Sequence, residues 1–210
     1  MKEKPILFNT EMVKAVLAGN KTQTRRVIKN ACDIITDWDK NDPSYGPFYE
    51  DEFGDSHESI ERCPYGKIGD QLWVRETFCI GRVCETDGHP MERTEYVDQC
   101  AGDNDILPKE FCLFEDIDIS EVIWKPSIFM FRKDSRIQLE ITNIRVQRIQ
   151  DISATDIENE GALTKPTEIN DVLPIWIKLW DSINKKRGFG WDKNPWVWVI
   201  EFRRVPDDQD

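Results

Sequence analysis

The segment RIQLEITNIRVQRI, at residues 136–149, constrains the fold of this chain more than any other. The apolar residues of its first half alternate on one face of an extended strand, and Ile144 and Val146 continue the alternation one residue out of phase. A bulge near Thr142–Asn143 would join the two halves, and bulges bend strands as closure of a small barrel requires. The segment therefore predicts one long, bent strand.

Three other segments have the pattern of strands. The first is the short apolar run PILF at 5–8, and the second is GDQLWVRETF at 69–78, which opens with a turn. The third, WVWVIEFRRV at 196–205, is apolar enough to lie in the middle of a sheet. Strands and helices do not alternate regularly along the chain, so we expect a sheet of mixed direction.

Capping residues predict two short helices. Thr10 is placed to cap the first, which ends at Gly19, where a glycine cap belongs. Ser153 caps the second with Asp156 as its capping-box partner, and Gly161 ends it. The sequence therefore predicts both the first and the last residues of these two helices.

A third helix is predicted at residues 171–186, where apolar residues recur at helical spacing. Its expected buried stripe consists of Leu173, Trp176, Leu179, Trp180 and Ile183, and the two tryptophans are assigned to the core. Together the strands and helices give an α+β fold class, with a small mixed β-barrel and flanking helices.

Charge is distributed unevenly along the chain and marks two insertions. The formal net charge of the 210 residues is −12, but residues 31–62 carry −8 and residues 81–121 carry −9, which leaves +5 for the rest. Both blocks are rich in turn formers, so we expect long acidic surface loops, with FCLFEDIDI at 111–119 as one short strand. We therefore predict a single domain at 1–205 with two inserted loops, followed by a disordered tail at 206–210.

The stretch LAGNKTQTRR, at 17–26, is the main candidate for a functional site. Residues 12–32 contain no acid, and a tight helix-to-strand turn holds Lys21 while leaving its side chain accessible. Arg25 and Arg26 are consecutive in a strand, so they point to opposite faces and one is directed toward the barrel mouth. An inward arginine needs an anionic partner, either a carboxylate or a bound phosphate. A solvated basic turn is the simpler interpretation of the same residues.

Glu160 is the candidate carboxylate. It follows Ile157 by three positions at the end of the second short helix, so both share the face turned toward the protein body. An ordinary, partly exposed helical glutamate would show the same pattern. An enzymatic interpretation requires that Glu160 and Lys21 meet in one hollow, and the sequence alone gives no contact between them.

Four segments, in this order, resemble the ASCH domain, and in particular its longer versions encoded by bacteriophages and prophages. They are PILFNTEMVKAVLAGNKTQTRRV, GDQLWVRETF, WKPSIFMFRKDSRIQLEITNIRVQRIQDISATDIENEGA and WVWVIEFRRV. The resemblance covers the first thirty residues and nearly all of 63–80 and 122–205, and it leaves out the acidic blocks. Phage relatives usually carry a histidine and a proline in the segment written here SIFMF, where this chain has Phe129 and Phe131.

This resemblance implies a PUA-like β-barrel with an RNA-associated cleft. The enzymatic members that it points to are small bacterial amidohydrolases, which remove the acetyl group from N(4)-acetylcytidine. In these members a G-x-K-T-x-T turn supplies a lysine and a threonine, and the helix after the long strand supplies a glutamate. The corresponding positions here are Lys21, Thr24 and Glu160, and Thr22 matches a further position of the turn.

Hydrolysis of an exocyclic amide needs a nucleophile or base, a donor to the developing oxyanion and an acid for the leaving amine. Catalysis by histidine is not expected, because His57 and His89 both lie in the acidic blocks. We predict Lys21 as nucleophile or general base, Glu160 as proton shuttle, and Thr24 as the hydroxyl that orients the carbonyl.

The expected substrate contacts come from Thr22, Arg25, Arg26, Trp73 and Trp124. The arginines would lower the pKa of the lysine by repulsion, and the tryptophans offer faces on which a base can stack. The predicted partner is a modified cytidine nucleoside or nucleotide, or RNA. A non-catalytic RNA-binding phage protein and a ribonuclease fit the same residues. In a further alternative the two acidic loops, and not the basic turn, are the functional surface, which mimics nucleic acid to occupy a host protein. A local basic patch beside acidic loops favours a small substrate over a long polyanion.

Other classes of protein are not indicated. The six cysteines show no paired spacing, and Cys79, Cys84, His89 and Cys100 fit no zinc module, so we expect free thiols and neither metal nor cofactor. No apolar run is long enough to span a membrane, and the N-terminus lacks the pattern of a signal peptide. We therefore expect a cytoplasmic protein.

Overall fold

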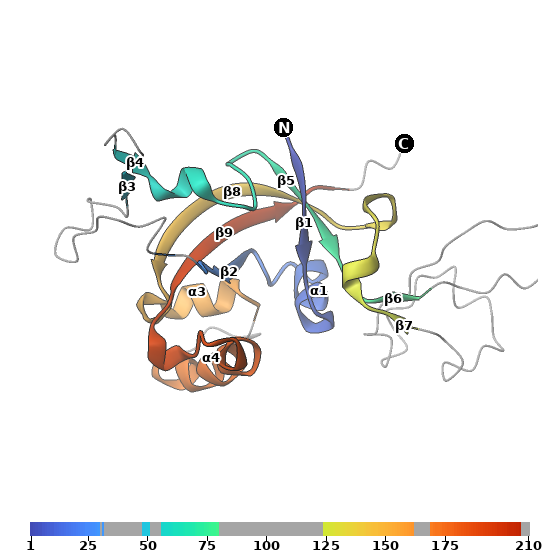
Figure 1. Cartoon of the computed structure of the whole chain (residues 1–210). Helices are drawn as coiled ribbons and strands as arrows, with labels where there is room; N and C mark the ends of the chain where they lie inside the picture. Colours follow the sequence, from blue (N-terminus) through green and yellow to red (C-terminus); the bar gives the residue numbers. More distant parts are fainter. Residues whose placement is uncertain (30, 32–47, 51–55, 80–123, 162–168, 207–210) are drawn as a thin grey trace, which may run out of the picture.

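Five strands form one mixed sheet in the computed structural model of the chain (Figure 1). The structure describes residues 1–29, 31, 48–50, 56–79, 124–161 and 169–206. The strands of the sheet are β1 (Glu3–Leu7), β2 (Gln23–Val27), β5 (Gln71–Arg75), β8 (Gln138–Arg148) and β9 (Trp196–Arg204). The helices are α1 (Thr10–Leu17), α3 (Ala154–Asn159) and α4 (Ile169–Asn184). Two small pairs of strands lie outside the sheet, β3 (Phe48–Glu50) with β4 (Ser56–Glu58), and β6 (Phe78–Cys79) with β7 (Trp124–Lys125).

The strand order is β1-β5-β8-β9-β2, with β1 and β5 parallel and the other neighbours antiparallel. The predicted α+β class with a mixed sheet is therefore confirmed. Figure 1 shows β8 and β9 as two long arched strands, with α3 and α4 beneath one end of the arch and α1 beside β1. The two edge strands approach each other, since Nη2 of Arg26 in β2 donates a hydrogen bond to the carbonyl oxygen of Leu7 in β1 at 2.7 Å.

The long bent strand has the predicted bulge. The pairing of β8 with β9 shifts register between Ile141 and Asn143, which returns the second half of the apolar alternation to the same face. Strand β9 lies between β8 and β2, as its composition predicts, and alternate residues enter two hydrophobic clusters. Trp198 and Ile200 pack in the cluster with β1 and α1, whereas Val197 and Val199 pack against α3 and α4.

The capping predictions are confirmed for α3 and wrong by one residue for α1. The Ser153 side chain accepts from the backbone N–H of Asp156, and the Asp156 side chain accepts from the backbone N–H of Ser153. In α1 the cap is Asn9 and not Thr10, because Oδ1 of Asn9 accepts from the N–H of Met12 at 2.9 Å. Asn9 and Thr10 are adjacent and both residue types are good helix caps, so the sequence alone did not distinguish between them.

Helix α4 begins and ends within two residues of its predicted bounds, and a 3₁₀ turn at Lys185–Arg187 follows it. Trp176 and Trp180 are buried, as predicted, but Leu179 and Ile183 are not: their exposed fractions are 36% and 40%. Periodicity identifies the apolar face of a helix but not how much of that face its neighbours cover. Here α3 and β9 cover the tryptophan side only, and the remaining apolar residues line a pocket described below.

The first acidic block is more structured than predicted. It contains the β3–β4 hairpin and the 3₁₀ turn Ser59–Arg62, where we expected a loop without strands. Turn-forming residues obscure three-residue strands because so short a strand has no readable period. The second acidic block, including FCLFEDIDI, and most of the predicted tail lie outside the described residues. The division into one domain with insertions therefore stays a prediction.

Within the described part of the chain, none of the helices has the length and apolar character to cross a membrane. The same residues contain no cluster of three or more histidine, cysteine or acidic side chains able to hold a metal ion. Cys63 is buried with a free thiol, and the metal-like set at 79–100 lies almost entirely outside the described residues.

A glycine joins the end of α3 to the turn that follows α1. Gly161 has a left-handed φ of +72°, and a Cβ built there would lie 2.7 Å from Cβ of Ala15 and 2.9 Å from Cβ of Lys21. Gly19 has a nearly identical φ of +75°, but nothing lies within 4 Å of its own Cβ position. The two glycines therefore share a conformational requirement and differ in space.

This contrast predicts unequal losses of stability. Gly19→Ala should lower the free energy of unfolding by about 1 kcal/mol, because alanine disfavours the left-handed conformation. Gly161→Ala should lower it by about 1–3 kcal/mol more, because its methyl group would also push apart the end of α3 and the residues Ala15 and Lys21. Urea denaturation of both variants measures the difference. Equal midpoints would show that Gly161 is not packed tightly against Ala15 and Lys21.

Candidate active site

Lys21 lies in the turn between α1 and β2, which is fixed by backbone hydrogen bonds on both sides. The N–H groups of Asn20 and Lys21 both donate to the carbonyl oxygen of Ala15, at 2.9 and 3.0 Å. The N–H of Thr22 donates to the carbonyl oxygen of Asn159 at 2.8 Å, and Lys21 forms an isolated antiparallel bridge with Glu160. The turn is therefore joined directly to the end of α3.

The side chains of Lys21 and Glu160 meet in the interior. Nζ of Lys21 lies 2.9 Å from Oε2 of Glu160, and both residues are less than 10% exposed. The same Nζ donates to the carbonyl oxygens of Gln23 and Glu160 at 2.8 Å each. All three protons of a lysine ammonium group thus have an acceptor, so the charged form is fully hydrogen-bonded in the resting site.

Arg25 shares the same carboxylate and extends the network. Its Nη1 lies 3.1 Å from Oε1 of Glu160, and its Nη2 lies 3.0 Å from Oδ2 of Asp156. Oδ1 of Asp156 accepts in addition from Nη2 of Arg145 at 2.5 Å and from Nε2 of Gln23 at 3.0 Å. The expectation that an inward arginine has an anionic partner is fulfilled twice for Arg25.

Burial and neighbouring charges change two pKa values in this network. The pKa of Lys21 lies below its ordinary value, chiefly because burial disfavours the ammonium form; the charges of Arg26 and Arg25 lower it further, and Glu160 opposes them. Burial would raise the pKa of Asp156, but the backbone hydrogen bond from Ser153 and the positive charge of Arg25 bring it below its ordinary value. A lower lysine pKa means that more of the amine is neutral near pH 7.

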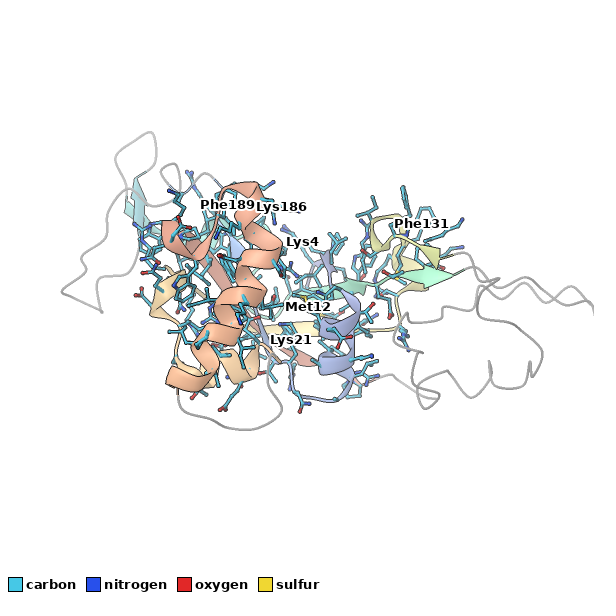
Figure 2. All side chains as sticks on the ribbon, turned by 90° about the horizontal axis from the view of Figure 1, so that it is seen from below. Lys4, Met12, Lys21, Phe131, Lys186 and Phe189 are labelled. Atoms are coloured by element: carbon cyan, nitrogen blue, oxygen red, sulfur yellow. The ribbon has the colours of Figure 1, made fainter. Side chains whose placement is uncertain are left out.

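The network forms one wall of a pocket between α1 and α4. The cavity has a volume of about 630 Å³, which is in the range of small-molecule sites. Figure 2 shows Lys21 and Met12 in the space between the two helices, seen from below. Residues of the turn, of β2, of both helices and of the end of α3 line the cavity, among them Lys21, Thr24, Arg25, Arg26, Glu160 and Trp176.

The structure brings five of the eight predicted site residues to this pocket. These five are Lys21, Thr24, Arg25, Arg26 and Glu160. Thr24 is 1% exposed, and both arginines border the same cavity although their side chains leave the strand in different directions.

The other three predicted residues lie elsewhere. Thr22 is exposed and lines a second, smaller hollow together with Arg145 and Asp156. Trp73 is buried in β5 with the guanidinium group of Arg75 4.7 Å from its ring centre, and it does not border the pocket. Trp124 lies in β7, which pairs with β6 outside the main sheet. Trp73 is therefore not placed to stack on a ligand of this pocket, and the stacking role of Trp124 stays a prediction.

Several residues of the network and of the pocket were missed by sequence reasoning. Asp156, a partner of Arg25 outside the pocket lining, was assigned only as a helix cap. Tyr65 and Arg187, which line the pocket, belong to segments that carry no recognisable motif. Ile175, which is 50% exposed, lines the cavity with Leu179 from the next turn of α4. Leu179 belonged to the predicted apolar stripe of this helix and was interpreted as core, whereas Ile175 was not part of that stripe.

Comparison with known proteins adds few constraints. The sequence matches no protein-family model and no curated protein. Among solved structures, the ASCH domain from Lactobacillus crispatus JV V101 aligns with a TM-score of 0.43 and 8% identity, over 97% of this chain and 79% of that one. The hypothetical protein PH0355 aligns with a TM-score of 0.37 and 13% identity, over 98% of this chain and 100% of that one. The description of the site therefore rests on the geometry of this chain.

The shared carboxylate predicts an order of stabilities. Glu160→Gln should cost about 3–5 kcal/mol, because it leaves two buried cations facing a neutral group. Lys21→Met should cost less, about 1–3 kcal/mol, because Glu160 keeps Arg25 as its partner and only carbonyl acceptors lose a donor. Urea denaturation at neutral pH gives both values. The reverse order would mean that Glu160 does not balance both charges.

Proposed function

We propose that the protein is an amidohydrolase that removes an acyl group from a modified cytidine nucleoside or nucleotide. The observation that carries the proposal is the lysine–glutamate pair, with 2.9 Å between Nζ and Oε2, at the wall of a cavity large enough for such a ligand. The resemblance of the turn and its flanking segments to ASCH amidohydrolases supports the same assignment. Thr24 borders the cavity beside the pair and completes the set of three groups that the resemblance implies.

The reaction begins with a proton transfer inside the pair. Lys21 gives a proton to Oε2 of Glu160 and becomes a neutral amine, which removes a proton from the water that attacks the acyl carbon. If the amine attacks the acyl carbon itself, the acyl group is transferred to Nζ, and a water molecule must then hydrolyse that bond to release the acid and free the lysine. The Thr24 hydroxyl orients the carbonyl oxygen. Glu160 then gives its proton to the exocyclic nitrogen of the base as the amide bond breaks, which returns the carboxylate to its resting form.

The lowered pKa of Lys21 supports this role. Burial is its main cause, and the nearby charges of Arg26 and Arg25 add to it. A buried amine that is more easily deprotonated is the form that nucleophilic and general-base chemistry both require. The departure from the phage pattern does not touch the pocket, because Phe129 and Phe131 are 59% and 68% exposed and do not line it.

A non-catalytic nucleic-acid-binding module is the second candidate. It is favoured by the three acceptors around Nζ of Lys21, which would hold a purely structural ammonium group equally well. In that case the basic pocket would bind its ligand without turnover. A ribonuclease would use the same pair on a 2′-hydroxyl group and phosphate.

Replacement of Lys21 separates these functions. Lys21→Met should lower the hydrolysis of N(4)-acetylcytidine by about 10²–10⁴-fold, the usual contribution of a general acid–base group. Lys14→Met is the matched control, since among the described residues Lys14 has an ion pair only with the exposed Glu11, at 3.7 Å. Products are identified by mass after incubation with acylated cytidines and with short RNAs.

Each outcome of this assay supports one function. Unchanged turnover in folded Lys21→Met would overturn the catalytic role of the lysine. Binding of RNA without any product supports the binding module, and Lys21-dependent scission of RNA supports the ribonuclease.

The pH dependence of turnover tests the protonation state. The reacting pair holds one proton, which Lys21 passes to Glu160, so kcat/KM should fall as the pH rises through the loss of that proton, at a midpoint below 10.5, the ordinary pKa of lysine. Arg26→Gln removes a positive charge that lowers the pKa of Lys21, so its midpoint should move to higher pH. Lys186→Gln, which changes a charge outside the pocket lining, should leave the midpoint in place. A midpoint that is the same in Arg26→Gln contradicts the electrostatic account.

A further inference from the structure

The charges of the pocket fall into two layers. In the inner layer Lys21 and Arg25 share Glu160, and Arg25 also reaches Asp156 behind the pocket lining, with these pairs between 2.9 and 3.1 Å. Asp156 pairs in turn with Arg145, whose other partner is Glu201, so three cations meet three carboxylates and the network is balanced. A ligand that reaches this layer meets hydrogen-bonding groups but no excess of charge.

The outer layer has cations without carboxylates. Arg26, Lys29 and Arg187 line the cavity, and among the described residues none of them has a carboxylate within 4.0 Å. The remaining acid of the lining, Glu11, is exposed and lies 3.7 Å from Nζ of Lys14. The outer layer therefore has a surplus of positive charge, although the whole chain has a net charge of −12.

Arg26 is held in place independently of any ligand. Its Nη2 donates to the carbonyl oxygen of Leu7 at 2.7 Å, and its guanidinium group lies 5.5 Å from the ring centre of Phe8. Arg187 donates to Oδ1 of Asn184 at 3.3 Å. Burial lowers the pKa of Arg26, the charges of Tyr65 and Glu160 oppose this, and the positive charge of Arg187 lowers it further.

The opposite wall of the pocket is apolar. Ile175, Leu179 and Ile183 are spaced four residues apart on α4, and their exposed fractions are 50%, 36% and 40%. Met12 of α1 lies on the other side of the same cavity (Figure 2). An apolar slot of this kind accepts a flat base, and cations at its mouth accept an anion attached to that base.

We propose that Arg26, Lys29 and Arg187 form a phosphate subsite at the mouth of the pocket, and that the substrate is a mononucleotide rather than a free nucleoside. The inference deepens the proposed function and depends on it for the identity of the base. A mononucleotide matches both features of the cavity, the apolar slot and the surplus of positive charge. Free inorganic phosphate would use only the cations, and a long RNA would extend beyond them toward a chain of negative net charge.

Binding measurements without turnover test this subsite. Calorimetry compares cytidine, cytidine 5′-monophosphate, cytidine 3′-monophosphate and inorganic phosphate on the full chain. At least one monophosphate should bind about tenfold more tightly than cytidine, because its phosphate group gains charge-assisted hydrogen bonds that cytidine cannot make. Arg187→Gln should reduce this ratio severalfold, and added salt should reduce it too. The matched control Lys186→Gln, one residue away and outside the lining, should leave the ratio unchanged.

The outcomes distinguish this proposal from the proposed function. Equal binding of cytidine and both monophosphates, no measurable binding of either monophosphate, or equal effects of the two variants would overturn the subsite, even if acetylcytidine is hydrolysed. Tighter binding of inorganic phosphate or of short RNA than of a mononucleotide would also overturn it. A preference for a monophosphate that depends on Arg187 supports the subsite, and it does so even when no acyl group is removed.

Discussion

A buried carboxylate shared by two buried cations holds the site together, because none of the three side chains can leave water without the others. Glu160 comes from the end of α3, Lys21 from the turn after α1, and Arg25 from β2. Burying a charge alone costs several kcal/mol, so the three segments are stable in this arrangement only when they are together. Asp156 provides the second negative charge that two cations need. The site and the contact between α3 and β2 are therefore the same interaction.

This balance also determines which chemistry the pair can perform. When a proton moves from Lys21 to Glu160, two opposite charges disappear together, and the net charge of the cluster does not change. Burial disfavours the ammonium form of Lys21 and lowers its pKa, so it favours the neutral amine relative to a lysine in water. The protein can thus generate a neutral amine without exchanging a proton with the solvent. Arg25 limits the effect, because it retains its attraction for the carboxylate form.

Local features of the sequence predicted local features of the fold. The capping box of α3, the left-handed glycines that follow α1 and α3, and the bulge in β8 depend on a few neighbouring residues, which the sequence displays directly. The second role of Asp156, as partner of Arg25, depends on a strand more than a hundred positions earlier, and no spacing reveals it. The exposed apolar residues of α4 show the same limit. Their period was clear, but they line a cavity whose other side is formed by α1, from the other end of the chain, and no spacing within α4 reveals that cavity.

Net charge is a poor guide to what this pocket attracts, because electrostatic interactions in physiological salt weaken over about 8 Å. A ligand confined to the cavity interacts mainly with the residues that line it, and these carry five cationic side chains and two carboxylates. A long polyanion meets, in addition, the field of a chain whose formal charge is −12. The size of the ligand therefore decides which of two opposite charges it meets. A small anion is attracted where a large one is repelled, so an acidic chain with a cationic pocket selects for small anionic ligands by electrostatics alone.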